Sequence, residues 1–289
     1  MVDDALFKAV TGLQTASGKP WGRFLDSGTG THSLRWVHTL PTAGWTAVTA
    51  DAQFAANMQA ELQLTDAERA QASTAACIIV GNWQDESFQE GEIYDTILAD
   101  YLIGAIDGFS PYYQDEIFDR LKRHLAPGGT LFIIGMQPVP DSAPHPANIV
   151  TEVARLRDAC ILLAGHRPYR EFPLDWVERH LKKAGFAVTL SRRMPILHSE
   201  GSIRRQLDVA SRKLPYFEDR DLAAAMERHI AAVGARIVST CSCVRGGRIQ
   251  LGFDYVVAAE PLPRPPGAAA ASSENGRAAG DVAGEEMAT

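Results

Sequence analysis

The chain has 289 residues, of which 46% are hydrophobic and 22% charged, a composition typical of a globular protein with a buried core. Its apolar runs are far shorter than the roughly 20 residues of a membrane helix, and its first residues lack the pattern of a secretory leader. Four irregularly spaced cysteines suit neither a disulfide framework nor a zinc site, so we expect a cytoplasmic protein with no metal and no membrane partner.

The net charge of −7 is unevenly distributed, with −10 over residues 1–149 and +6 over residues 150–215. The acidic first half argues against general nucleic-acid binding, and no nucleic-acid partner is expected. The basic stretch could face an anionic acceptor or form the solvated sides of helices, and the second interpretation is favoured.

Short apolar runs alternate with segments of helical spacing along the first half of the chain. Strands are expected over residues 23–26, 45–50, 76–80, 94–99 and 130–135. Helices are expected over residues 32–40, 53–64 and 116–125, whereas the aromatic-rich segment 107–113 is expected to be a loop. Strands that alternate with helices in this way predict a parallel sheet with right-handed crossovers.

The second half continues the pattern with insertions. Helices are expected over residues 148–164, 174–184, 202–214 and 219–238, and strands over 186–192 and 249–258. The fold class is therefore α/β, with a seven-stranded, mostly parallel, doubly wound sheet. We expect one domain over residues 1–260, with helical cap insertions at about 141–173 and 196–247. Residues 261–289 contain too few large apolar side chains to offset their chain entropy, which predicts a disordered tail.

A glycine turn follows the first strand in the segment Asp26-Ser27-Gly28-Thr29-Gly30. Two glycines between a strand and a helix allow a ligand to approach the backbone, because no Cβ intervenes. About 20 residues later Asp51 ends the second strand, where a carboxylate can bind ribose hydroxyls. Asp51 could also be the N-cap of the following helix, and the two roles are compatible.

The carboxylate two residues before G-x-G resembles motif I of the class I S-adenosylmethionine-dependent methyltransferases. A dinucleotide fold is disfavoured because Ser33 occupies the place of the third glycine. The resemblance implies a Rossmann-like methyltransferase fold and S-adenosyl-L-methionine as the cofactor. It also implies that the turn surrounds the methionine part of the cofactor, with Asp26 near its amino group.

Other segments agree with that family in the right order. Asn82 and Trp83 follow the third strand, where the family contacts the adenine, although the family often has Asp at the position of Asn82. Residues 94–101 match the strand-four motif, whose end borders the methyl group, and residues 121–133 and 181–186 are similar to later motifs. The resemblance covers roughly residues 20–135 and 174–192 plus the last strand. The cofactor-binding residues that it and the loop imply are Asp26, Ser27, Gly28, Thr29, Gly30, Asp51, Ala52, Asn82, Trp83 and Asp100.

Residues that contact the methyl acceptor are predicted from their positions alone, because the resemblance implies almost nothing about acceptor-binding residues. Methyl transfer is an in-line displacement that depends on holding the reactants close and aligned, with a nearby base for a neutral nucleophile. The candidate catalytic residues are Tyr101, His145 and Tyr169. The candidate substrate-binding residues are Tyr113, Arg170, Glu171 and His198. Core packing for Tyr101 and a plain surface position for His145 stay open as alternatives.

The leading functional hypothesis is a methyltransferase that methylates nitrogen or oxygen of a small molecule. A non-catalytic S-adenosylmethionine-binding regulatory module is the first alternative, because no unmistakable catalytic base is present. An RNA or protein methyltransferase that uses the basic region is the second, and an NAD-dependent oxidoreductase is the third. The segment Ala99-Asp100-Tyr101-Leu102 lacks the Asn-Pro-Pro-Tyr type of motif found in enzymes that methylate exocyclic base nitrogens.

Overall fold

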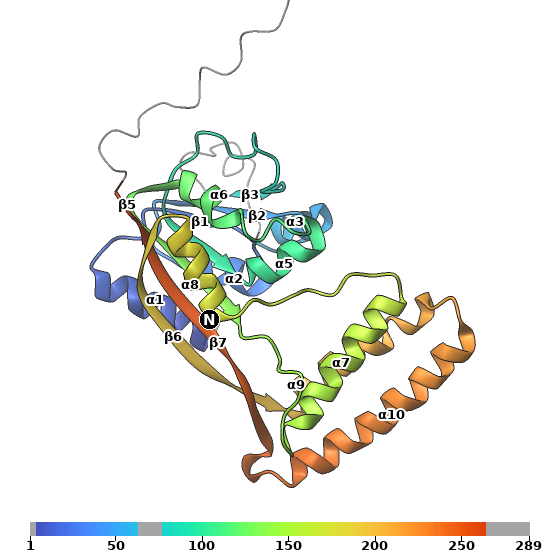
Figure 1. The fold of residues 1–289 in the computed structure, drawn as a ribbon. Helices are drawn as coiled ribbons and strands as arrows, with labels where there is room; N and C mark the ends of the chain where they lie inside the picture. The colour runs from blue at the N-terminus through green and yellow to red at the C-terminus, as the bar shows by residue number, and fades with distance from the viewer. Residues whose placement is uncertain (1–3, 63–76, 264–289) are drawn as a thin grey trace, which may run out of the picture.

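The computed structural model describes residues 4–62 and 77–263, and its centre is one seven-stranded sheet (Figure 1). The strand order is β3-β2-β1-β4-β5-β7-β6. Strands β3, β2, β1, β4 and β5 are parallel, and β7 runs antiparallel to both β5 and β6. The strands are β1 (Arg23–Asp26), β2 (Gly44–Thr49), β3 (Cys77–Val80), β4 (Tyr94–Asp100), β5 (Leu125–Met136), β6 (Phe186–Ser199) and β7 (Arg248–Pro261).

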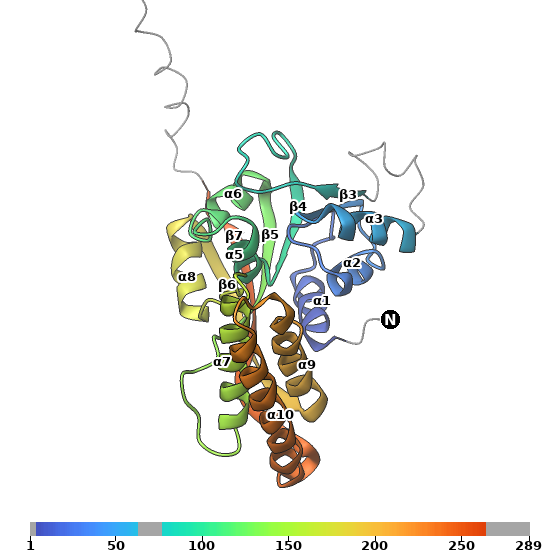
Figure 2. The ribbon, with the colours of Figure 1, turned by 90° about the vertical axis from the view of Figure 1, so that its right-hand side faces the viewer.

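Helices α1 (Ala5–Ser17), α2 (Thr31–Val37) and α3 (Ala52–Glu61) cover one face of the sheet, as Figure 2 shows. Their apolar side chains pack with Phe24, Leu98 and Phe132 of the central strands. Alternate residues of a strand point to opposite faces, so Leu25 and Ile97 belong to the core on the other side. Helices α5 (Leu102–Phe109), α6 (Ile117–Arg123) and α8 (Leu174–Lys183) contribute to that second core.

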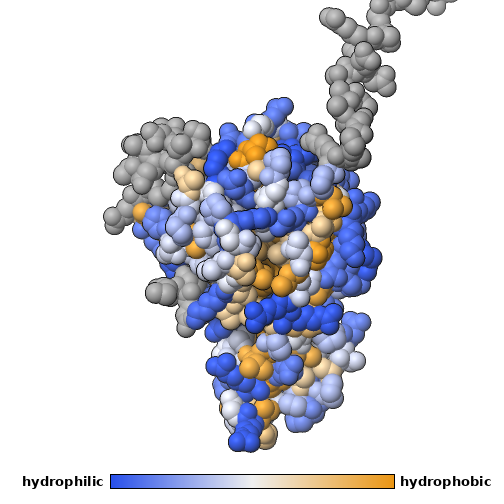
Figure 3. All heavy atoms as spheres, turned by 90° about the vertical axis from the view of Figure 1, so that its left-hand side faces the viewer, coloured by the Kyte–Doolittle hydropathy of each residue, from blue (hydrophilic) through white to orange (hydrophobic). Residues whose placement is uncertain are grey.

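A helical cap lies beyond the end of the sheet and is formed by α7 (Asn148–Leu163), α9 (Glu200–Ser211) and α10 (Arg220–Ser242). These three helices share a separate hydrophobic core that includes Leu156, Leu207 and Val233. The long antiparallel pair of β6 and β7 runs from the sheet to the cap, and short 3-10 turns occur at Leu214–Tyr216 and Arg245–Gly247. Figure 3, a view from the left-hand side of Figure 1, shows the cap as a lobe below the main body.

The sheet agrees with the sequence prediction, but several element ends differ. Strand β6 continues to Ser199 instead of residue 192, because its pairing with β7 extends as far as Arg248. Strand β7 includes Pro261, where we expected the tail to begin, because Pro261 pairs with Phe186. The rest of the predicted tail from residue 264, and residues 63, 64 and 76 of two predicted elements, lie outside the described residues.

Helix α5 was not predicted, and residues 107–109, which we expected in a loop, form its last turn. Gly104 and Gly108 lower the intrinsic helix propensity of this segment, which hid the helical spacing of its apolar residues. None of the helices in the described part of the chain is long and apolar enough to span a membrane. The same residues contain no cluster of three or more side chains that could hold a metal ion.

Candidate functional site

A cavity of about 440 Å³ lies at the carboxyl ends of β1, β2 and β4. This edge is where ligands bind in open α/β sheets. The cavity is bordered by the loop after β1, the start of α3, the loop after β3, helix α5 and part of the α7–α8 connection. Its lining includes Ser27, Gly28, Thr29, Gly30, Asp51, Asn82, Trp83 and Asp100, which are eight of the ten predicted cofactor-binding residues.

The glycine turn is fixed by backbone contacts with the neighbouring strands. The Ser27 N–H donates to the Leu98 carbonyl over 2.8 Å, and the Thr29 N–H donates to the Val48 carbonyl over 2.7 Å. The Ser27 hydroxyl also donates to the Leu98 carbonyl, over 2.7 Å. The chain therefore presents the turn to the cavity in a fixed conformation.

The two glycines of the turn have different surroundings. A Cβ at Gly28 would lie 2.6 Å from Cδ1 of Leu102, so this glycine permits close packing against α5. A Cβ at Gly30 would meet no heavy atom within 4 Å, and Gly30 has φ −118°, which any residue adopts. Neither packing nor backbone geometry requires glycine at position 30, whereas a ligand in the cavity would.

Asp51 acts as the N-cap of α3. Its Oδ1 accepts a hydrogen bond of 2.9 Å from the Phe54 N–H. Its Oδ2 forms no hydrogen bond with a described residue, and the side chain is exposed at the cavity edge. One oxygen caps the helix, and the other is available to a ligand.

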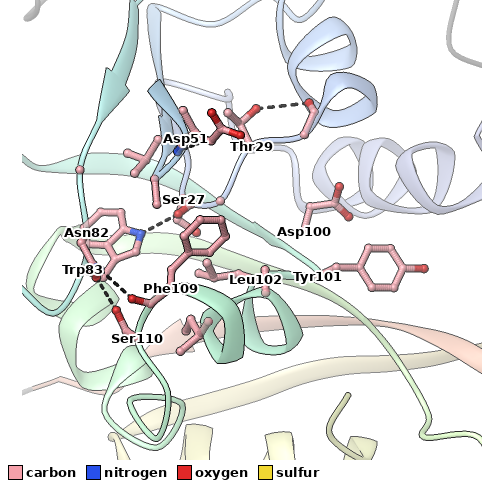
Figure 4. A pocket seen from close by; sticks show the side chains of 18 of the residues that line it. Ser27, Thr29, Asp51, Asn82, Trp83, Asp100, Tyr101, Leu102, Phe109 and Ser110 are labelled. Carbon is pink, nitrogen blue, oxygen red and sulfur yellow. Dashed lines mark hydrogen bonds between the residues drawn. The ribbon is translucent and has the colours of Figure 1, made fainter. Parts of the chain in front are cut away.

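Asn82 and Trp83 lie at the opposite end of the cavity from Asp100 and Tyr101 (Figure 4). The Asn82 Oδ1 accepts from the Ser110 hydroxyl over 2.6 Å, and its Nδ2 donates to the Phe109 carbonyl over 3.2 Å. The Trp83 indole N–H donates to the Ser27 carbonyl over 2.6 Å. Both side chains therefore tie the loop after β3 to α5 and to the glycine turn, in addition to bordering the cavity.

Two carboxyl groups near the turn have raised pKa values. Asp26 is fully buried and does not line the cavity. Its burial raises its pKa to about 6, although the nearby Thr29 and Ser33 hydroxyls and the Gly28 N–H lower it in part. Burial also raises the pKa of Asp100 to about 8, with a further contribution from the negative charges of Asp26, Asp4 and Asp254. Asp100 does line the cavity, so a titratable carboxyl borders it near neutral pH.

Tyr101 has a left-handed backbone, with φ 48° and ψ 20°, at the start of α5. Its hydroxyl donates a hydrogen bond of 2.8 Å to Oδ1 of Asp254. Burial and the charge of Asp254 raise the pKa of Tyr101. The ring borders the cavity, but the hydroxyl already has a carboxylate acceptor, so Tyr101 is poorly suited to accept a proton from a substrate.

The remaining predicted residues divide into two groups. Tyr113, Tyr169 and Glu171 line the cavity, whereas His145, Arg170, His198 and Ala52 do not. His145 is exposed on the segment before α7. The Arg170 guanidinium pairs with the Asp158 carboxylate at 3.0 Å, and the His198 ring lies 3.0 Å from the Leu251 carbonyl of β7. These contacts direct Arg170 and His198 to partners outside the cavity.

Much of the apolar lining was not predicted from the sequence. Helix α5 contributes Leu102, Ala105, Ile106 and Phe109, and α3 contributes Phe54. The spacing of Leu102, Ile106 and Phe109 along one helical face was the available signal. This helical face was missed because residues 107–113 were expected to form a loop.

Comparison with known proteins supports the fold. No protein-family profile matches the sequence, and no curated protein matches it either. A solved structure of an inferred methyltransferase from Bacillus halodurans superimposes with a TM-score of 0.53 at 12% identity. The match covers 89% of this chain and 100% of that one. The chain has the Rossmann-like methyltransferase fold.

Two further structures resemble the chain less closely. A Galdieria sulphuraria protein assigned as a sarcosine dimethylglycine methyltransferase gives a TM-score of 0.48 at 13% identity, covering 89% of this chain and 84% of that one. A cyclopropane synthase from Mycobacterium tuberculosis gives 0.48 at 18% identity, covering 87% and 84%. The β3-β2-β1-β4-β5-β7-β6 sheet, with β7 antiparallel, is the core of the methyltransferase fold in this chain.

Proposed function

We propose that the chain is an S-adenosylmethionine-dependent methyltransferase that acts on a small molecule. The observation that carries this proposal is the empty space at Gly30, on the cavity side of the turn after β1. Gly30 lines the cavity, and the absence of a Cβ there lets a ligand approach the backbone closely.

The charge of the cavity supports S-adenosylmethionine over a dinucleotide. Among the described residues, the lining includes the carboxylates Asp51, Asp100 and Glu171 and no lysine, arginine or histidine. S-adenosylmethionine carries a sulfonium and an ammonium group, which suit such surroundings. Carboxyl groups with no cationic side chain among them suit these two cations better than the pyrophosphate of a dinucleotide.

The residues around the cavity can be assigned roles on this basis. The free Oδ2 of Asp51 would accept hydrogen bonds from the ribose, and the turn at Ser27, Gly28 and Gly30 would hold the methionine part. Phe54 and Trp83 offer apolar surface for the adenine. The cofactor supplies an electrophilic methyl group. Asp100 and Glu171 can hold a proton at a carboxylate oxygen near neutral pH, because burial raises their pKa values to about 8 and about 7.

The walls of the cavity support a small acceptor. Helix α5 forms one wall, and Tyr169 and Glu171 of the connection between α7 and α8 form another. An acceptor that fits between these walls is a small molecule or a single side chain. Of these two, the proposal takes the small molecule as the acceptor.

Replacement of Gly30 by Val tests the proposal. Thermal stabilisation by S-adenosylhomocysteine is compared in the wild type, Gly30→Val and Gly12→Val. Gly12 is an exposed glycine of α1 that also has no neighbour within 4 Å of its Cβ position. We expect stabilisation of the wild type and Gly12→Val, and its loss in Gly30→Val. Equal stabilisation of all three proteins would contradict the assignment of the turn.

A further inference from the structure

The connection between α7 and α8 fits closely against two glycines of α5. A Cβ at Gly104 would lie 2.8 Å from Oε1 of Glu171, and a Cβ at Gly108 would lie 2.8 Å from Cε1 of Tyr169. Gly104 and Gly108 are four residues apart and therefore lie on the same face of the helix. The missing side chains of α5 thus let the Glu171 carboxyl and the Tyr169 ring reach the cavity wall.

The other charged side chains nearby already have partners. Arg167 pairs with Asp107 at 3.2 Å. Arg170 and Arg157 both pair with Asp158, and Arg157 also donates to Gln206. These contacts satisfy three guanidinium groups without Glu171.

Glu171 is half-buried and forms no hydrogen bond or ion pair with any residue in the described ranges 4–62 and 77–263. Among the described residues, the charge of Arg157 lowers its pKa, whereas Asp254 raises it and burial raises it most. A half-buried carboxylate without a contacting cation is costly, and a cationic ligand would remove that cost.

The surroundings of Glu171 suit a cation in a second way. Tyr169, Tyr113 and Phe109 also line the cavity. Aromatic faces attract cations through their negative electrostatic potential, by about 0.5–2 kcal/mol for each favourable contact. Carboxylates and aromatic rings without a basic side chain would bind an ammonium group and repel a carboxylate or phosphate.

We propose that the methyl acceptor is a cationic amine whose ammonium group is bound by the Glu171 carboxylate beside the Tyr169 ring. This inference rests on the proposed methyltransferase function and specifies its substrate class. The ammonium group anchors the acceptor in this proposal, and acidic metabolites that lack such a group are excluded as acceptors. Glu171 is a binding group for the acceptor in this proposal.

Three probes with the same ring separate charge from shape: benzylamine, benzyl alcohol and benzoate. Each is titrated at about pH 8 into full-length protein saturated with S-adenosylhomocysteine. We expect benzylamine to bind at least about tenfold more tightly than benzyl alcohol, and benzoate to bind weakest, because an ion pair in a partly buried site is far stronger than in water. Equal affinities, or no binding of the amine, would overturn the proposal.

The variant Glu171→Gln then tests whether Glu171 causes the preference for benzylamine over benzyl alcohol. It should bring the affinity for benzylamine to within about threefold of that for benzyl alcohol, because the amide has no charge. Glu90→Gln, at an exposed position outside the cavity, should keep the full preference. Should Glu171→Gln fail to fold, Gly104→Ala provides the same test, since its Cβ would displace the Glu171 carboxyl. A preference that survives both substitutions would overturn the role of Glu171.

The two proposals fail in different ways. Absence of S-adenosylhomocysteine binding to the wild type would contradict the methyltransferase function itself. Normal binding of S-adenosylhomocysteine without a preference for the amine would contradict the acceptor class alone.

Discussion

The Tyr101 hydroxyl donates a 2.8 Å hydrogen bond to the Asp254 carboxylate, which joins the start of α5 to the antiparallel strand β7. Tyr101 adopts a left-handed backbone, which is uncommon for a residue other than glycine. The contact therefore fixes a strained position at the carboxyl edge of β4, beside Asp100. It gives Tyr101 a structural role and makes Tyr101 a poor general base.

Tyr101→Phe should lower stability without abolishing ligand binding. Loss of a hydrogen bond to a partly exposed carboxylate costs about 1–2 kcal/mol, which corresponds to a decrease in Tm of about 3–6 °C. Calorimetry of the variant and of Tyr216→Phe, an exposed tyrosine, measures this difference. A Tm equal to that of the wild type would show that the Asp254 contact contributes little.

Substitutions of Asp51 can separate its role as the N-cap of α3 from its proposed role in ligand binding. Asn is as good an N-cap as Asp, so Asp51→Asn should keep the Tm but weaken S-adenosylhomocysteine binding. Asp51→Ala should weaken binding and also lower the Tm by about 2–4 °C, through loss of about 1 kcal/mol of capping. Asp219→Asn, at the N-cap of α10, is the matched control and should leave binding unchanged. Unaltered binding by Asp51→Asn would remove Asp51 from the ligand site.

The raised pKa of Asp100 predicts a pH-dependent stability. Its pKa is about 8 in the folded protein, against 3.8 for an ordinary aspartate. Between these values the folded state binds more protons than the unfolded state, so this group's contribution to stability falls as the pH rises. Asp100→Asn should therefore raise the Tm by at least about 2–4 °C at pH 8 and have little effect near pH 4.

Thermal unfolding of the wild type and Asp100→Asn between pH 4 and pH 8 tests whether the gain in Tm increases with pH. Asp115→Asn, at an exposed position near α6, serves as the control. A gain for Asp100→Asn that is equal at both pH values would mean that the amide stabilises by packing and not by removing a buried charge.

The central part of the fold could be predicted because local signals were strong there. Phe24 and Leu25 point to opposite faces of a buried strand, and the glycines after Asp26 mark its end. The spacing to Asp51 then placed the second strand and the cap of α3 correctly. Each of these features depends on residues close together in the chain.

The contacts that hold the site residues in place join distant segments, and the sequence did not reveal them. Asn82 is bonded to Ser110 and Phe109, about 28 residues away, and no local pattern reveals this. Glu171 reaches the cavity because Gly104 leaves room for it. The roles of Arg170 and His198 depend on Asp158 and Leu251, which only the folded chain brings near. Sequence spacing therefore predicted more of the cavity lining around the glycine turn than along α5.

Isothermal titration with S-adenosylhomocysteine, with NAD and NADP as controls, tests the central claim most directly. Micromolar binding of S-adenosylhomocysteine alone is the predicted result, because the cavity pairs an open glycine turn with carboxylates and lacks a basic side chain among the described residues. Preference for either dinucleotide, or no binding of any of the three, would contradict the account of this cavity.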